Sequence, residues 1–123
     1  MVSAHGLVVS PPVRAAGPAM NASCGSAVTE IVMGDPTSHV EGLPEAAAKD
    51  SQYNATACNL FLCKGLQFAD NIMNVQKFTP GQVVNIKANI TIPHTGPANV
   101  SVIDTTTNMI IGKSMISFPV YAE

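Results

Sequence analysis

The sequence has few aromatic and few charged residues. It contains no tryptophan, two tyrosines and four phenylalanines, and 11% of its 123 residues are charged, against a typical quarter. The formal net charge of −2 excludes a basic surface for nucleic acid or acidic lipid. No apolar run approaches the roughly 18 residues of a membrane span. Aliphatic residues are plentiful, which argues against disorder, so we expect one small domain with an aliphatic core.

Several common active-site patterns are also missing. The sequence has no G-x-S-x-G turn of a serine hydrolase, and no P-loop or G-x-G-x-x-G run for a nucleotide. Its eight Asp and Glu residues show no pairing of the kind that a hydrolytic glycosidase needs. Three cysteines and three scattered histidines do not make a zinc-site pattern. These absences argue against the corresponding enzyme classes.

Four Asn-x-Ser/Thr triplets are candidate N-glycosylation sites. Their asparagines are Asn21, Asn54, Asn89 and Asn99. Apolar and polar residues alternate over residues 84–92, as in a half-buried strand, and Asn89 falls on the polar face. The same alternation places Asn99 outside. We therefore expect a secreted glycoprotein, with glycans supplying the solubility that its few charges do not.

The three cysteines, Cys24, Cys58 and Cys63, are an odd number. We expect a single disulfide, and the sequence leaves its pairing open. The remaining cysteine implies a free thiol, an intermolecular bridge or a partner that is missing from the chain.

The N-terminus lacks the apolar stretch of a signal peptide. Only four residues precede His5, and they match the end of such a peptide, with Val2 at −3 and Ala4 at −1. We expect residues 1–4 to be a signal-peptide remnant, His5 to be the first mature residue and residues 5–123 to be one domain. Alternatively, Met1 is simply the start of the chain.

The second half of the chain has the pattern of short strands separated by turns. It predicts strands near residues 83–92, 98–103, 109–111 and 115–121, with turns at residues 79–82 and 105–108. Near the N-terminus, a short apolar strand from His5 runs into a segment stiffened by proline. Together these strands predict a mostly β fold, an antiparallel β-sandwich.

Between these strands the sequence predicts little regular structure. Residues 19–41 look irregular, and a short helix is expected over residues 43–49, where Pro44 falls early in the helix. Residues 58–65 form a tight apolar segment with Cys58 and Cys63 near its ends. Most phenylalanines are expected in the core.

Two histidines have positions that suit a metal ion. An N-terminal His5 would chelate through its α-amine, whose pKa is near 8, and through its imidazole. His94 follows a predicted strand in a loop bounded by Pro93 and Gly96, and it would supply a third nitrogen. Nitrogen-only, near-planar coordination favours Cu(II). His39, by contrast, is expected to be solvated and without a partner.

The opening His5-Gly6 with Pro11-Pro12-Val13-Arg14, then Cys24-Gly25, residues 57–65 and the His94 loop, resembles the lytic polysaccharide monooxygenases. The resemblance is closer to the fungal secreted proteins with chitin-binding type-4 domains, and it covers nearly the whole chain, from His5 to Tyr121. It implies an immunoglobulin-like β-sandwich and one copper ion held by His5 and His94 in a histidine brace. Arg14 and the two prolines would have a structural role, fixing the N-terminal segment.

The resemblance also implies an activity: oxidative cleavage of chitin or cellulose by copper, which an external electron donor reduces. The protein would act as a monomer on a polysaccharide surface. Such domains are usually longer, and the chain carries no motif that makes Tyr121 the axial copper residue, so we expect it to be cut at both ends. Two alternatives remain: a copper-binding module without oxidative activity, and a cell-wall carbohydrate-binding module with idle histidines.

Overall fold

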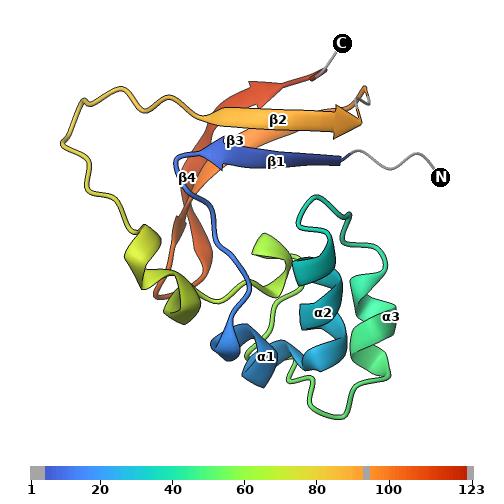
Figure 1. Ribbon diagram of the computed structural model, residues 1–123. Helices are drawn as coiled ribbons and strands as arrows, with labels where there is room; N and C mark the ends of the chain where they lie inside the picture. Colours follow the sequence, from blue (N-terminus) through green and yellow to red (C-terminus); the bar gives the residue numbers. More distant parts are fainter. Residues whose placement is uncertain (1–4, 93–94, 122–123) are drawn as a thin grey trace. The chain divides into compact units, whose positions relative to one another are not determined.

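The computed structural model describes residues 5–92 and 95–121. The chain forms two compact units, Gly6–Asn89 and the segments Met1–His5 with Ile90–Glu123, and each is described by itself. The described residues contain the following elements: β1 (His5–Ser10), α1 (Pro18–Cys24), α2 (Ser26–Gly34), α3 (Leu43–Ala48), the 3₁₀ helices η1 (Cys63–Gly65) and η2 (Phe68–Asn74), β2 (Lys87–Ile92), β3 (Ala98–Asp104) and β4 (Met109–Phe118) (Figure 1).

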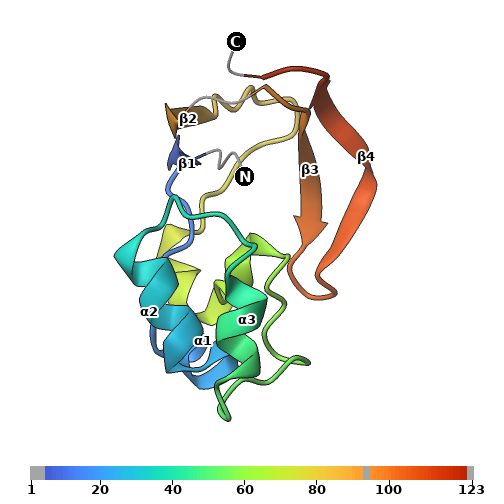
Figure 2. The same ribbon diagram turned by 90° about the vertical axis from the view of Figure 1, so that its right-hand side faces the viewer.

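Helices build the core of the Gly6–Asn89 unit. α1 packs against α2, and α2 against α3, as Figure 2 shows. The core forms where their apolar faces meet. Its buried members are Met20, Cys24, Val28, Val32, Leu43, Ala47, Cys58 and Leu60. A disulfide joins Cys24 to Cys58 inside this core, so the sequence's open question of pairing is answered.

The N-termini of α1 and α2 are both capped by an aspartate from a distant part of the chain. Asp70 accepts hydrogen bonds from the backbone N–H groups of Ala19 and Met20, both at 2.8 Å. Asp50 accepts one from Ala27 at 3.0 Å. Because the first backbone N–H groups of a helix have no partner within it, these carboxylates satisfy donors that the helices leave open.

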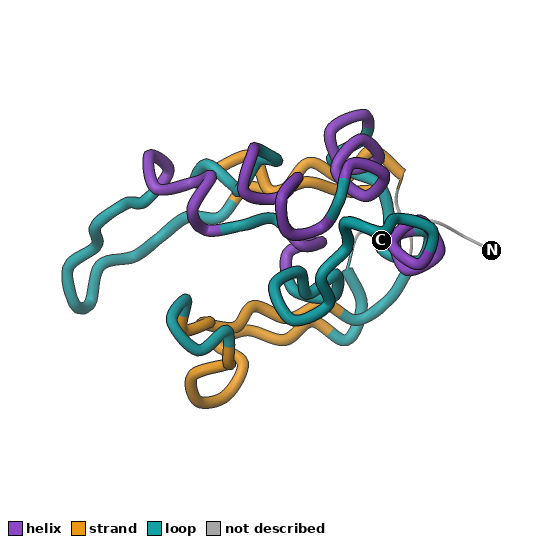
Figure 3. Tube along the Cα trace, turned by 90° about the horizontal axis from the view of Figure 1, so that it is seen from below, coloured by secondary structure: helices purple, strands orange, loops and turns teal. Residues whose placement is uncertain are grey.

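The strands form two separate two-stranded sheets, β1 with β2 and β3 with β4. β3 and β4 are antiparallel, with Val100 opposite Ile116 and Val102 opposite Ile111. Between these two pairs β3 advances by two positions and β4 by five, so β4 carries the extra residues as a bulge. Gly112, whose φ is +69°, lies in this bulge. After η2, residues 75–86 form a long loop with a turn at its tip, where the Gln82 N–H donates to the Thr79 carbonyl (Figure 3).

The predicted β-sandwich is wrong. A sandwich needs two sheets that bury their inner faces against each other, whereas β2 and β4 are exposed along their whole length. The core members lie between residues 20 and 60, mostly in helices. The immunoglobulin-like architecture implied by the resemblance is therefore not present, and the fold is mixed α and β.

Other predicted elements have mixed outcomes. Residues 19–41 are not irregular, because α1 and α2 occupy most of them. The helix predicted over residues 43–49 is confirmed as α3, and the strand at 98–103 as β3. The strand near 83–92 begins only at Lys87, and the two strands expected at 109–111 and 115–121 are one strand, β4.

Candidate functional site

His5, the first proposed copper ligand, is half-buried at the start of β1. The hydroxyl of Thr91 donates a hydrogen bond to the backbone carbonyl of His5 at 3.1 Å. Thr91 is the fifth residue of β2, which ends at Ile92. This bond therefore fixes the beginning of β1 beside the end of β2.

His94, the second proposed ligand, lies outside the described residues. It follows Thr91 by three positions in the sequence. Among the residues that the structure does describe, no three His, Cys, Asp or Glu side chains come together as a metal site. The described residues therefore do not test the histidine brace, because one of its two histidines is not among them.

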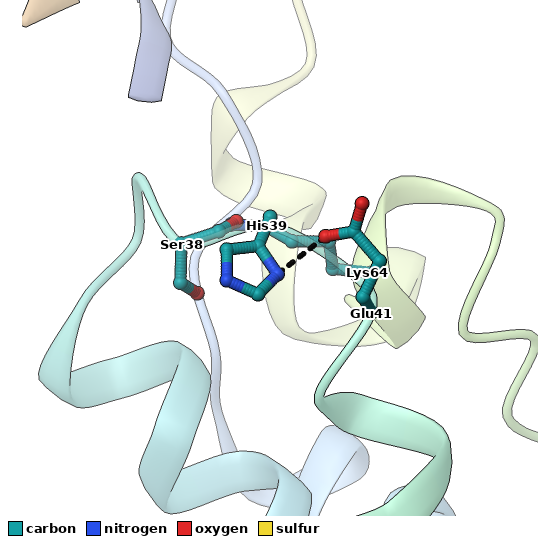
Figure 4. Close-up of polar contacts among 4 residues, drawn as sticks. All are labelled: Ser38, His39, Glu41 and Lys64. Carbon is teal, nitrogen blue, oxygen red and sulfur yellow. Dashed lines mark hydrogen bonds and ion pairs between the residues drawn. The ribbon is translucent and has the colours of Figure 1, made fainter. Parts of the chain in front are cut away.

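A polar cluster that the sequence did not indicate joins the loop after α2 to η1 within the Gly6–Asn89 unit (Figure 4). His39 does have a partner: its Nδ1 lies 2.5 Å from Oε2 of Glu41. The Lys64 ammonium donates to the carbonyl of Ser38 at 3.0 Å and to that of Pro36. The Ser38 hydroxyl oxygen is buried and has no hydrogen-bond partner within the described part of the chain.

The cluster has a structural role, because Lys64 holds the loop that contains Pro36 and Ser38. The Lys64 Nζ fills the position where the two carbonyls converge, and partial burial lowers the pKa of this ammonium, with Asp35 opposing the shift. The His39 and Glu41 side chains are 43% and 71% exposed, so water screens their interaction. Because the Ser38 hydroxyl is buried, it is not placed to attack a substrate.

The three cysteines have distinct environments. Cys63 is the cysteine left over from the disulfide, and it is free and exposed in this chain. It is followed by Lys64 and Gly65, and all three have positive φ. A Cβ on Gly65 would lie 2.8 Å from both sulfurs of the Cys24–Cys58 disulfide, so only glycine lets this turn pass so close to the disulfide.

Arg14 has the structural role that was expected. Its guanidinium donates to the Leu66 carbonyl at 2.9 Å and lies over the ring of Phe68, 5.6 Å from the ring centre. Asn71, which is buried, holds the neighbouring Ala15 by its backbone N–H and carbonyl. The extended segment after β1 is thus fixed to the region around η2.

The phenylalanines are not in the core, contrary to expectation. Phe61 is 77% exposed, and the other three are between 42% and 48% exposed. Exposed rings are chemically suited to stack on a flat sugar face. This is the feature of the structure that bears most directly on a polysaccharide partner.

No family model matches the chain, and no curated protein matches it significantly. In the described residues no helix is long and apolar enough to cross a membrane.

Proposed function

We propose that this chain is a secreted copper-binding domain that acts on a polysaccharide surface of the chitin or cellulose type. The observation that carries the proposal is the hydrogen bond from Thr91 to the His5 carbonyl. His94 is three residues beyond Thr91, and three residues span at most about 11 Å. The pairing of β1 with β2 thus supports His5 and His94 as ligands of one ion. The proposal rests on these two histidines and not on the fold, because the described strands form two separate small sheets and no sandwich.

The donor set suits copper. Processing after Ala4 would give His5 an α-amine beside its imidazole, and His94 would add a third nitrogen, a combination that favours Cu(II). When reduced by an external donor, the copper would supply oxygen chemistry at a sugar C–H bond. The chain's own contribution is to hold His5: its carbonyl is bonded to Thr91, and β1 continues into the segment fixed by Arg14. The buried Cys24–Cys58 disulfide suits an oxidising, extracellular location.

A Cu(II) titration followed by electron paramagnetic resonance tests the metal site. The protein is processed to begin at His5 and compared with protein that retains Met1 and with a His94→Ala variant. His39→Ala is the matched control, because His39 pairs with Glu41 and is not a proposed ligand. The site is supported if the processed protein and its His39→Ala variant bind copper tightly, with nitrogen hyperfine structure, and if this binding is lost in the Met1-retaining protein and in His94→Ala. Equal, weak binding in all four proteins overturns it.

The polysaccharide partner needs a separate assay. Insoluble chitin and cellulose are each mixed with the protein, bound protein is measured by sedimentation, and soluble oxidised sugars are measured with copper and a reductant. Phe61→Ala should weaken sedimentation because it removes the most exposed ring. Ile31→Ala, at 40% exposure and aliphatic, is the control. Copper binding without oxidised sugar would leave a non-catalytic copper module. The absence of both polysaccharide binding and oxidation would refute the substrate class.

A further inference from the structure

The four glycosylation triplets are equivalent in sequence pattern but not in structure. Asn21 lies in α1, Asn89 in β2 and Asn99 in β3. Asn54 differs from these three because it lies outside every helix and strand, at the start of a turn. An enzyme that modifies such a triplet must reach the asparagine amide and the hydroxyl of the third residue. The backbone of Asn54 is itself hydrogen-bonded, so the triplets differ in the accessibility of these two side-chain groups.

The side chain of Asn54 is held by its own turn. Its Oδ1 accepts hydrogen bonds from the backbone N–H groups of Thr56, at 3.0 Å, and Ala57, at 3.2 Å. Asn54 and Thr56 are both exposed. Within the described part of the chain, neither the Asn54 Nδ2 nor the Thr56 hydroxyl has a hydrogen-bond partner. The nitrogen that would receive a glycan and the hydroxyl that an enzyme would read are thus both available.

The other three triplets are compromised in different ways. In α1, Asn21 and Ser23 are two residues apart and so face different sides of the helix. The Thr91 hydroxyl is already bonded to the His5 carbonyl, so the Asn89 triplet lacks a free hydroxyl. The Ser101 hydroxyl is bonded to Asn99 Oδ1 and shared with Ser114, both at 3.2 Å, and Asn99 is paired with Ser117 in the β3–β4 register.

We propose that Asn54 is the residue of the folded chain that carries an N-linked glycan. The co-reactant is an oligosaccharide attached through pyrophosphate to a polyisoprenoid lipid. A bond forms between Asn54 Nδ2 and the anomeric carbon of the first sugar, and the bond from that carbon to the pyrophosphate oxygen breaks. The lipid pyrophosphate leaves, the nitrogen gives up one proton to a base of the transferase, and nothing is oxidised or reduced.

The tertiary structure supports this position for a glycan. The Asn54 N–H donates to the Ser23 carbonyl at 2.9 Å, and the Asn54 carbonyl accepts from Cys58 at 2.8 Å. The backbone of Asn54 is thus tied to α1 and to the disulfide while its side chain stays outside. A glycan attached there would displace no buried group. A ranking by hydroxyl residue alone would instead place Asn89 beside Asn54, because both of their triplets end in threonine.

Glycan transfer to folded and to unfolded protein tests the proposal. The disulfide-bonded, unglycosylated full chain and the same chain reduced in denaturant and alkylated are each given a eukaryotic oligosaccharyltransferase and its lipid-linked oligosaccharide. Site occupancy is measured by peptide mass spectrometry. We expect Asn54 to be modified severalfold more than any other asparagine in the folded protein, and this preference to shrink in the unfolded chain.

Two variants keep the result interpretable. Thr56→Ala removes the hydroxyl that the enzyme reads but leaves the backbone bond to Asn54 Oδ1, so modification should be lost while circular dichroism is unchanged. Ser114→Ala, outside every triplet, should leave the occupancy of Asn54 as it was. Modification of Asn21, Asn89 or Asn99 as strong as that of Asn54 in the folded protein overturns the proposal. So does a folded protein in which Asn54 stays unmodified, whatever the unfolded chain does.

Discussion

Asp70 reaches the start of α1 because Gly17 has no side chain. A Cβ on Gly17 would lie 2.6 Å from the Asp70 Cγ, closer than real atoms approach. The carboxylate instead occupies that space and accepts the N–H groups of Ala19 and Met20. Gly25 and Asp50 repeat this arrangement at the start of α2, so both helices depend on a glycine and a distant aspartate.

Removing the Asp70 carboxylate should destabilise α1. Asp70→Ala leaves two backbone donors without an acceptor, and we expect the free energy of unfolding to fall by about 1–2 kcal/mol. Urea unfolding followed by circular dichroism measures this change. Gly17→Ala should cost a similar amount by displacing the same carboxylate, whereas Gly34→Ala, where nothing lies within 4 Å, should not. Equal stability of the three variants would contradict the capping role.

Asp50 should make the stability of the protein depend on pH at acid values. Hydrogen bonds from the backbone of Ala27 and then Gln52 hold the pKa of its carboxyl below the ordinary value. A carboxyl with a lowered pKa in the folded state stabilises the fold above its unfolded pKa of about 3.9, and this contribution is lost as the pH falls through the lower, folded value. Unfolding free energies measured from pH 6 down to pH 2 should therefore decline. Asp50→Asn should flatten part of this decline, and an unchanged slope would argue against the assignment.

Gly65→Ala should strain the turn beside the disulfide. Its φ of +80° disfavours any side chain, and the added Cβ would meet both sulfurs. We expect a loss of about 1–3 kcal/mol in unfolding free energy, measured by denaturant titration without reductant. Gly42→Ala is the control, since its φ is −81° and no atom lies within 4 Å of the added Cβ. A fully stable Gly65→Ala protein would show that this approach is not as close as described.

Loss of the Cys24–Cys58 disulfide should have the largest effect on stability. The bond joins residues 34 positions apart inside the core, and such a loss typically costs about 2–5 kcal/mol. Thermal unfolding of the double variant Cys24→Ala/Cys58→Ala measures it. Cys63→Ala should be nearly neutral because this thiol is exposed and free. A titration of the native protein with a thiol reagent should find one reactive thiol per chain; three, or none, would disagree with this pairing.

Part of the helical core can be predicted from the spacing of apolar residues, which the expectation of a β fold left unused. Met20, Cys24, Val28 and Val32 are buried and recur every four residues, the spacing of one helix face. The prediction of irregular structure over residues 19–41 overlooked this series, which has Gly25 in its middle. Gly25 is the boundary between α1 and α2, where its φ of +82° turns the chain. A count of apolar spacing across the glycine would have predicted the two helices.

The sequence alone determined the local features: the α3 helix, the β3 strand, the turn at Thr79 and the presence of one disulfide with one cysteine left over. Each depends on neighbouring residues or on a count. Only the tertiary structure decided which cysteines pair, which distant aspartates cap which helices, and that the strands form two small sheets instead of a sandwich. It also separated four triplets of the same Asn-x-Ser/Thr pattern into one in a turn and three in helix or strand. These outcomes depend on contacts between residues tens of positions apart, whose free energies are set by packing and by the satisfaction of buried polar groups, and no local pattern encodes them.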